Sequence, residues 1–491
     1  NAWTVKVLDS MAFTQMGLDK SLKAFEIESV KYEKPAGLGD KYLKTKEFEE
    51  YAKQDVKALY KLCEKIIDFH KAFDISISVS IAQFSMKVFR HNYLRQGDVI
   101  KYPPKQCVGM SERSYHGGLN YYKYDRPKYF KNLIEYDINS SYPYACKFLP
   151  SMLVGNFTKV NKLDKRNHGV YLVDGYIESD IPIIFNDEYK RIDGHFENIC
   201  LTDWDIKAGI EYADKFEFTI KEGWVYLDQS DYNPFSHFID DIYKKRCEAK
   251  NKPMKIIYKF ILNSFYGKFI QTNEEEHFDF LSLEDSRAKK IKTSFKMLPE
   301  EERANLHFYI DKAINEFVLK EKTFSAGFYY NPFIATLITS NARYRIIGIL
   351  KKYKGVHCAT DSIKTEVEIP ESELGTKLGQ LKKEVEGKCF IYRNKFYLHY
   401  AKDYSKCNHK SDEVMDKIGN QHLCKVAVHG YKGSLDNIIK NKYNLIKKPN
   451  MTYEYTKVIK IREGIKQKLP IADFIKKREI LNLVKKGDKN E

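Results

Sequence analysis

The chain has 491 residues, about three times the length of an ordinary single domain. With 43% hydrophobic and 31% charged residues it is expected to be globular, which excludes a disordered or collagen-like chain. Its 83 Lys and Arg residues outweigh 67 Asp and Glu residues, giving a net charge of +16. This surplus favours a polyanionic partner such as nucleic acid, although a basic soluble protein without such a partner fits the charge equally well.

Cysteine usage and hydropathy narrow the class further. The nine cysteines are an odd number and form no C-x-x-C pair, so neither a disulfide framework nor a zinc ribbon is predicted and a reducing compartment is expected. No run of about 18 apolar residues occurs, so no membrane span is predicted. The first residues lack the pattern of a signal peptide. Because the chain begins at Asn1 and not at methionine, we expect it to be a fragment.

The N-terminal region, residues 1–75, is predicted to end in a long helix over 46–69. Apolar residues recur there at steps of three and four, on one helical face: Phe48, Ala52, Val56, Leu59, Cys63 and Ile66. A connector spaced by proline and glycine follows over 76–130, and it contains Tyr115-His116-Gly117-Gly118.

A short strand is predicted over 132–138, where apolar and β-forming residues alternate. It leads into the turn Asn139-Ser140-Ser141-Tyr142-Pro143, ahead of a new helix. A carboxylate at the end of a strand, here Asp137, can hold a hard cation, and the amides of the turn can cradle phosphate. An ordinary strand-to-helix turn uses the same residue types, so this motif alone leaves both interpretations open.

A hairpin of two helices is predicted over 235–250 and 253–269, with an asparagine cap and a proline in the first turn of the second helix. On that helix Lys259, Asn263 and Tyr266 lie at i, i+4 and i+7 and therefore share one face. Such a face could grip a triphosphate and press a ring against a base pair. A solvated polar stripe is the alternative.

A helix predicted over 332–353 leads to a strand–turn–strand over 355–368. The turn, within His357-Cys358-Ala359-Thr360-Asp361-Ser362, offers Asp361 as a second carboxylate that could share a metal site with Asp137. Among the other segments, 155–228 is strand-rich without a motif, 272–325 is a charged and exposed insertion, and 420–491 is rich in lysine.

These segments occur in a fixed order that resembles motifs A, B and C of the family B DNA polymerases, D-x-x-S-x-Y-P, K-x-x-x-N-S-x-Y-G and D-T-D-S. Tyr115-His116-Gly117-Gly118 and Lys395-Phe396-Tyr397 resemble the Y-x-G-G and K-x-Y motifs of the protein-primed branch. Tyr51-Ala52-Lys53-Gln54-Asp55 resembles the Y-x-x-x-D motif that closes the family's 3′–5′ exonuclease site. The resemblance covers nearly the whole chain, and it is weakest in 272–325 and after residue 440.

The resemblance implies an α+β fold, the right-hand DNA polymerase with palm, fingers and thumb, and a partial RNase H-like exonuclease domain at the N-terminus. The parts implied are an exonuclease remnant (1–75), a connector (76–130), the palm (131–154 and 326–420), a first terminal-protein region (155–230), the fingers (231–271), an inserted second terminal-protein region (272–325) and the thumb (421–491).

The resemblance also implies template-directed DNA synthesis, in which dNTPs are added to a primer 3′-OH, and to the hydroxyl of a terminal protein at initiation. Two Mg²⁺ ions, or Mn²⁺ in their place, would be bound by Asp137, Asp361 and the carbonyl of Ile138. The incoming nucleotide would be held by Ser140, Ser141, Tyr142, Lys255, Lys259, Asn263 and Tyr266, with Lys259 also catalytic and Tyr142 excluding a 2′-OH. DNA would be contacted by Tyr115, Gly117, Gly118, Thr360, Lys395 and Tyr397.

Two departures from the family pattern matter. The exonuclease motifs expected upstream of Tyr51 and Asp55 are absent, so no proofreading activity is expected from this chain. Ala359 stands where the family usually has the first Asp of motif C, which motivates an alternative, a weak or inactive homologue that only binds primer–template or terminal protein. An RNA-primed enzyme is a second alternative. The expected partners are primer–template DNA, dNTPs and a terminal protein, for a monomer in a host cytoplasm or an organelle matrix and without a membrane.

Overall fold

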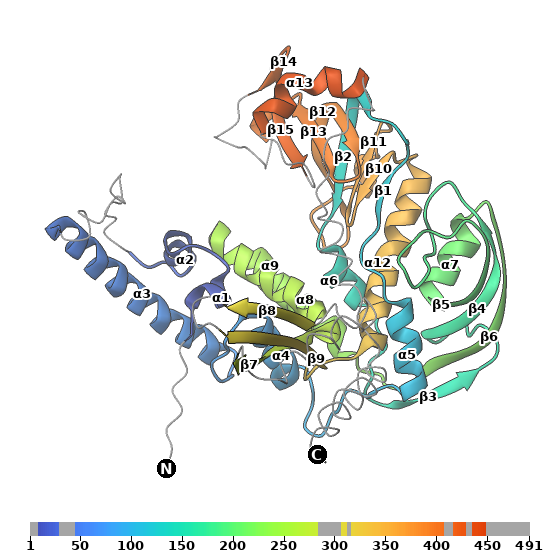
Figure 1. Ribbon diagram of the computed structural model, residues 1–491, viewed down its shortest axis with the longest axis horizontal. Coiled ribbons are helices and arrows are strands. Elements are labelled where there is room, and N and C mark those ends of the chain that lie inside the picture. Colours follow the sequence, from blue (N-terminus) through green and yellow to red (C-terminus); the bar gives the residue numbers. More distant parts are fainter. Residues whose placement is uncertain are drawn as a thin grey trace. The chain divides into compact units, whose positions relative to one another are not determined.

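The computed structural model describes residues 8–28, 45–282, 306–311, 316–406, 416–428 and 435–447. It divides into two compact units, one made of residues 1–267 and 331–468, and a smaller one made of residues 268–330 and 469–491. The expected α+β class is confirmed, because the larger unit combines two antiparallel sheets with packed helices (Figure 1).

An eight-stranded antiparallel sheet forms the centre of the larger unit. Its strands follow the order β1 (Asn120–Tyr122), β10 (His357–Ala359), β11 (Ser362–Thr365), β2 (Lys128–Ile138), β12 (Leu381–Arg393), β13 (Phe396–Ala401), β15 (Gln421–Val428) and β14 (Lys417–Ile418). Neighbouring strands therefore come from chain segments up to about 250 residues apart. β2 begins before the predicted residue 132, because Tyr129 and Phe130 also pair with β12.

The period of two along β2 separates the core from the site. Tyr136 and Ile138 belong to a core cluster that also contains Ile363 of β11 and Ile346 of helix α12 (Pro332–Lys352). Asp137, between them, therefore points to the opposite face of the sheet. Helix α12 matches the predicted 332–353. Its cap is the Asn331 side chain, which accepts a hydrogen bond from the Ile334 amide.

The strand-rich stretch forms a second antiparallel sheet in the order β3 (Gly155–Val160), β6 (Lys215–Asp228), β4 (Gly169–Glu178) and β5 (Gly194–Thr202). Helix α7 (Asp203–Tyr212) follows β5 and begins with a capping box between Thr202 and Asp205. The core cluster continues through this sheet and α7 to the buried side of α12, so α12 lies against both sheets.

The predicted helix hairpin is present as α8 (Pro234–Glu248) and α9 (Lys252–Gly267). The N-terminal helices α1 (Ser10–Thr14), α2 (Leu18–Ala24), α3 (Lys46–Ala72) and α4 (Ile81–Asn92) pack near it, with α2 and α4 in direct contact with α9. Aromatic rings fill this packing: Phe84 of α4 lies against Phe13, Phe69 and Phe73, while Phe89 of α4 stacks on Phe235 of α8.

The stretch 76–130, predicted as a connector, contains regular secondary structure. It contains α4, α5 (Lys105–Ser114) and strand β1. Proline and glycine suggested an irregular segment, but the Ser80 side chain caps α4, and Ile81, Phe84 and Val88 form a buried face on it. Tertiary burial of that face decides the structure.

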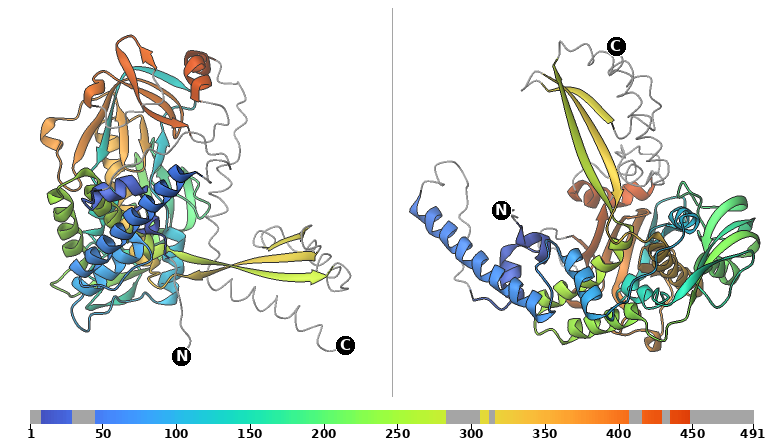
Figure 2. Two further views of the ribbon diagram at one scale, coloured as in Figure 1. Left: turned by 90° about the vertical axis from the view of Figure 1, so that its left-hand side faces the viewer. Right: turned by 90° about the horizontal axis from the view of Figure 1, so that it is seen from below.

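The smaller unit contains a three-stranded antiparallel sheet in the order β7 (Thr272–Ser282), β9 (Glu316–Ala326) and β8 (Leu306–Asp311). Figure 2 shows β7 and β9 as long paired strands, which run in register from the pair Thr272–Ala326 to the pair Ser282–Glu316. Of the predicted inserted segment, residues 283–305 and 312–315 lie outside the described residues.

The C-terminal region contains β15 and helix α13 (Leu435–Lys447), and residues 429–434 and 448–491 lie outside the described residues. Because β15 pairs with β13, the central sheet continues across residue 420, where the sequence suggested a change of domain. Among the described residues, no helix is both long and apolar enough to cross a membrane.

The aromatic packing gives a stability prediction. Phe84→Ala should lower the free energy of unfolding by about 3–5 kcal/mol, because Phe84 is fully buried and the change leaves a cavity among the rings. Denaturant titration would measure the loss. Val56→Ala on α3 is the control, since Val56 is 67% exposed and its loss should change the free energy by at most about 0.5 kcal/mol. Equal effects of the two changes would contradict the packing described.

Candidate active site

One cavity in the larger unit brings the three sequence motifs together. Its volume is about 570 Å³, and it lies between the end of β2, the β10–β11 turn, α9 and strands β12 and β13. The lining side chains come from seven separate segments: Asp137 to Pro143, Arg246, Lys259, Asn263, Tyr266, Ala359, Thr360, Asp361, Lys382, Glu384, Lys395, Tyr397 and Ala427. Most of the predicted nucleotide- and metal-binding residues therefore share one cavity.

The two carboxylates are presented by neighbouring strands. Asp137 pairs in register with Ser362 of β11, and the Ile138 amide donates to the Asp361 carbonyl at 2.9 Å. Asp361 sits in a two-residue turn with Thr360, whose φ of +68° is unusual for a β-branched residue. The Thr360 amide donates to the Leu119 carbonyl at 2.7 Å, which ties the turn to the start of β1.

Burial disfavours the ionised form of both carboxylates. Desolvation, together with the charges of Asp361 and Glu384, raises the pKa of Asp137 to about 7. Desolvation also raises the pKa of Asp361, although the nearby Lys259 opposes that shift. A divalent cation bound between the two carboxylates would favour their ionised form.

The possible metal ligands in this cavity suit an ion that also binds oxygen atoms of water or of a substrate. Within the described residues, no group of three or more His, Cys, Asp or Glu side chains is arranged to hold a metal. Two carboxylates and the Ile138 carbonyl would leave positions open for water and phosphate oxygens, as Mg²⁺ in phosphoryl-transfer sites requires.

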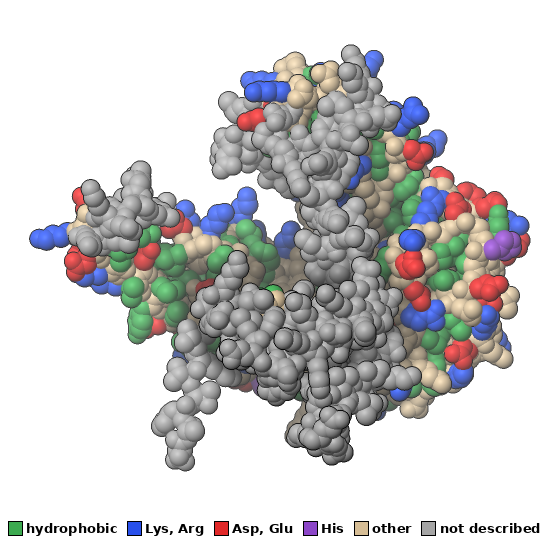
Figure 3. All heavy atoms as spheres, viewed as in Figure 1, with side chains coloured by type: hydrophobic (Ala, Val, Ile, Leu, Met, Phe, Trp, Pro, Cys, Tyr) green, Lys and Arg blue, Asp and Glu red, His purple; other side chains and the backbone are tan. Residues whose placement is uncertain are grey.

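Helix α9 forms the opposite wall. Lys259, Asn263 and Tyr266, expected on one helical face, all line the cavity. The rings of Tyr266 and Tyr142 stack with their centroids 4.5 Å apart and their planes 17° apart. Figure 3 shows basic side chains (blue) along the α8–α9 hairpin, whose exposed lysines are Lys244, Lys250, Lys252, Lys255 and Lys259.

The Tyr115–Gly118 segment lies under this wall without lining the cavity. A Cβ atom on Gly118 would come within 2.5 Å of the Thr360 Cγ2 atom and 2.6 Å of the Tyr142 hydroxyl, so only glycine leaves both side chains in place. A Cβ atom on Gly117 would meet nothing within 4 Å. Tyr115 is half-buried, and its charge is among the causes that raise the pKa of Tyr142, after desolvation and Tyr266.

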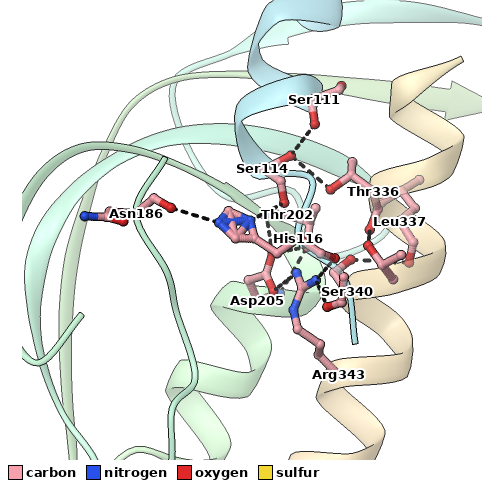
Figure 4. A network of polar contacts seen from close by, with 12 residues as sticks. Ser111, Ser114, His116, Asn186, Thr202, Asp205, Thr336, Leu337, Ser340 and Arg343 are labelled. Carbon is pink, nitrogen blue, oxygen red and sulfur yellow. Dashed lines mark hydrogen bonds and ion pairs between the residues drawn. The ribbon is translucent and has the colours of Figure 1, made fainter. Parts of the chain in front are cut away.

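A buried network holds this segment in place (Figure 4). Arg343 of α12 donates to the carbonyls of His116 and Gly117, and its Nη2 atom lies 2.7 Å from Oδ1 of Asp205 on α7. The His116 ring contacts the Asn186 carbonyl at 3.1 Å, and the hydroxyls of Ser114 and Thr336 lie 3.0 Å apart. The network thus connects the second sheet, α12 and the segment under Tyr142.

Of the remaining predicted residues, some line the cavity and others lie outside it. Lys395 and Tyr397 line the cavity, with Lys395 in the β12–β13 turn at a φ of +55°. Lys255 lies one turn before Lys259 and is exposed outside the cavity. Tyr51 and Asp55 lie on α3 and also do not line it, so their assignment to an exonuclease remnant stays a prediction.

Sequence reasoning missed three charged residues of the cavity. Arg246 of α8 donates from Nη1 to the Ser140 hydroxyl at 2.8 Å, and only its place in a basic stretch of the hairpin hinted at a role. Lys382 and Glu384 lie on β12, with Lys382 in register with Asp137 and its Nζ atom 2.7 Å from Glu384 Oε1. Glu384 brings a carboxylate to the cavity that Ala359, also in its wall, does not provide.

The raised pKa of Asp137 predicts how the metal-free protein responds to pH. The native state binds a proton that the unfolded state, with a usual Asp pKa of 3.8, has lost, so stability falls as pH rises from about 4 to about 7. Asp137→Asn cannot ionise and should raise the melting temperature at pH 8 by about 3 °C or more. Scanning calorimetry in EDTA would measure this, with Asp68→Asn on the exposed side of α3 as the control.

Adding Mg²⁺ at pH 8 should then raise the melting temperature of the unchanged protein and not that of Asp137→Asn, because ligand binding to the native state stabilises it. A lower melting temperature for Asp137→Asn in EDTA at pH 8 would contradict the electrostatics described.

Comparison with known proteins agrees with this geometry. Residues 19–355 match the family "DNA polymerase type B, organellar and viral". A "Probable DNA polymerase" of Podospora anserina is 23% identical over 452 residues, covering 84% of this chain and 36% of that protein. The "DNA-directed DNA polymerase" of Enterobacteria phage PRD1 is 24% identical over 370 residues, covering 73% of this chain and 60% of that protein.

Among solved structures, a phi29 DNA polymerase complexed with primer-template DNA and incoming nucleotide aligns with a TM-score of 0.64 and 20% identity, over 87% of this chain and 73% of that one. This likeness confirms the right-hand polymerase fold. The chain spans about a third of the length of the relatives from Podospora anserina and Agaricus bitorquis. With the family match extending over more than half of its residues, the chain belongs to the type B DNA polymerases of the organellar and viral kind.

Proposed function

We propose that this chain catalyses template-directed DNA synthesis, the addition of dNTPs to a primer 3′-OH. The observation that carries the proposal is the single cavity in which Asp137 and Asp361 face the Lys259–Asn263–Tyr266 side of α9. Family membership and the fold support the same reaction. The palm would be the central sheet with α12, and the fingers would be α8 and α9.

Asp137, Asp361 and the Ile138 carbonyl are the proposed ligands of two Mg²⁺ ions. When bound, these ions would supply the positive charge that activates the primer hydroxyl and stabilises the leaving pyrophosphate. The side chains do the positioning. Lys259 and Arg246 face the cavity as cations for the triphosphate, with the amides of Ser140 to Tyr142 as further donors. Lys255 lies one turn from Lys259 and outside the cavity, so it is the weaker candidate for contacting the phosphates.

The stacked Tyr142 and Tyr266 rings provide the surface for the sugar and the nascent base pair, beside Asn263. A tyrosine held this firmly leaves no room for a 2′-OH, which is the proposed basis of selection for deoxynucleotides. Lys395 and Tyr397 would hold the primer terminus, and Tyr115, Gly117, Gly118 and Thr360 would hold the template. Initiation on the hydroxyl of a terminal protein is part of the proposal, supported by the Y-x-G-G and K-x-Y motifs.

A binding-only homologue is the second candidate, and Ala359 is the observation that favours it. The intact Asp137 and Asp361 pair, and Glu384 in the same cavity, favour the enzyme. Primer extension separates the two, with a labelled primer–template, dNTPs and Mg²⁺ or Mn²⁺. The chain should extend the primer, and Asp361→Asn should lower the rate on the order of a thousandfold, because it removes a metal ligand.

Ala359→Asp and the exposed Asp68→Asn complete this set. Asp68→Asn should match the unchanged chain. Extension only after Ala359→Asp would mean a site limited by one missing carboxylate. If all variants bind primer–template and none extends it, the chain is a binding protein and the proposed reaction is wrong.

The two neighbouring glycines give a finer prediction. Gly118→Ala should lower kcat/KM for dNTPs about tenfold or more, because the added methyl group must displace Tyr142 or Thr360 by several tenths of an ångström. Gly117→Ala adds the same methyl group into open space and should leave the folded cavity unchanged. Single-nucleotide kinetics with both variants, and melting curves to verify folding, would test this. Equal kcat/KM values for the two variants would contradict the close approach.

A further inference from the structure

A row of buried ionisable side chains crosses the central sheet directly behind the two carboxylates. Glu135 lies two residues before Asp137 on β2, so both side chains point to the same face of the sheet. Opposite Glu135, in register on β11, stands Lys364, and His399 on β13 is in register with Lys425 on β15. Glu135 is fully buried and Lys364 is 1% exposed.

Glu135 is the anchor of this row. Its carboxylate forms ion pairs with Lys364 and with Lys425, whose Nζ atom lies 2.5 Å from Oε1. His399 lies 3.4 Å from the same carboxylate through Nδ1, and its Nε2 atom contacts the Leu133 carbonyl at 3.0 Å. Burial and Lys364 lower the pKa of His399 to about 4, so this ring is neutral near pH 7. One buried carboxylate therefore faces two ammonium groups.

Lys364 also contacts a residue of the cavity. Its Nζ atom lies 4.1 Å from the centroid of the Tyr397 ring, in cation–π geometry. The His357 ring meets the edge of the same ring with centroids 5.3 Å apart, and burial and Lys364 keep His357 neutral by lowering its pKa to about 3. Tyr397 is 5% exposed, packs against Lys364 and His357, and also lines the cavity.

A buried ion pair is a costly way to fill a sheet, because apolar side chains of the same volume serve stability equally well. Here the charge lies where an apolar residue would lose an interaction, since a cation is attracted electrostatically to the face of a tyrosine ring. Glu135 supplies the counter-charge that keeps the Lys364 ammonium in place. Lys425 remains as a partner of Glu135 if Lys364 is replaced, so a single change leaves a neutral pair.

We propose that Lys364 is a positioning residue, which holds the ring of Tyr397 from behind and thereby sets how the cavity receives the primer 3′ terminus. This inference rests on the proposed function for the meaning of Tyr397. The contact itself, and its effect on primer–template binding, do not depend on chemistry taking place.

A double-mutant cycle tests the proposal. Lys364→Gln keeps a hydrogen-bond donor for Glu135 and removes the cation, while Tyr397→Leu removes the ring. Affinity for a primer–template, measured by fluorescence anisotropy without dNTP, should fall roughly tenfold in each single variant. The double variant should fall no further than Tyr397→Leu alone, because Lys364 acts through the ring. The KM for dNTP should stay within about twofold in Lys364→Gln, since Lys259 and Arg246 are untouched.

Lys383→Met is the matched control. Lys383 lies on the neighbouring strand β12 and pairs with Glu368 and Glu386, in register with Tyr136 on the core face of β2. Its loss should leave primer–template affinity unchanged. If Lys364→Gln does not give a native melting curve, the cycle is repeated with Lys364→Met, which is similar in volume and carries no charge.

Additive losses in the double variant, or unchanged affinity in Lys364→Gln, would overturn the positioning role. A loss in Lys364→Gln that appears equally in the KM for dNTP would also overturn it, because a general disturbance of the sheet would have that effect. Absence of primer extension by the unchanged chain would count against the proposed function only, since the binding cycle still shows whether Lys364 and Tyr397 are coupled.

Discussion

The burial of two like-charged carboxylates at the ends of adjacent antiparallel strands is the constraint on which this structure depends. Desolvation pushes Asp137 and Asp361 toward protonation, and the charge of Asp361 adds to this effect on Asp137. The two carboxylates share the cavity with the basic side chains of Lys259 and Arg246. Ionising these buried carboxylates is unfavourable in the free protein, and a bound cation would offset that free-energy cost. Lys259, on the basic side of the α8–α9 hairpin, lines the same cavity.

Holding such a pair requires a stiff frame, and the frame is unusually polar for a sheet interior. The turn that carries Asp361 is fixed by the Leu119 carbonyl, and the segment below Tyr142 is fixed by Arg343. Behind the carboxylates, Glu135 forms ion pairs with the buried Lys364 and the half-buried Lys425. These groups have partners from other strands or helices, although the Nε atom of Arg343 is buried without a hydrogen-bond partner. Such partners are the condition for keeping buried charge in a folded protein.

The departure at Ala359 has a structural context that the motif alone does not reveal. Motif C keeps the carboxylate of Asp361 and its tight turn, while Glu384 reaches the cavity from β12. Lys382 and Glu384 lie two residues apart on β12 and both line the cavity, beside a β-bulge between Lys383 and Val385 in the pairing of β12 with β2. Among the described residues, three carboxylates line the cavity, from β2, the β10–β11 turn and β12.

Much of this protein could be predicted from sequence because the essential chemistry is local. A carboxylate at a strand end, three polar residues at helical spacing and a tight acidic turn each follow from short segments, and their order along the chain gave the family, the α+β fold and most of the cavity. The alternation over residues 132–138 also predicted the strand that carries Asp137.

Tertiary structure alone decided the rest, because strand pairing joins residues that are far apart in sequence. Lys382 pairs with Asp137 across about 250 residues, and the partners of Glu135 come from strands β11, β13 and β15. Helix α4 was not predicted from the sequence, and its burial against α9 and the aromatic cluster stabilises it. A sequence specifies which side chains can do chemistry, while the register of the sheet decides which of them meet.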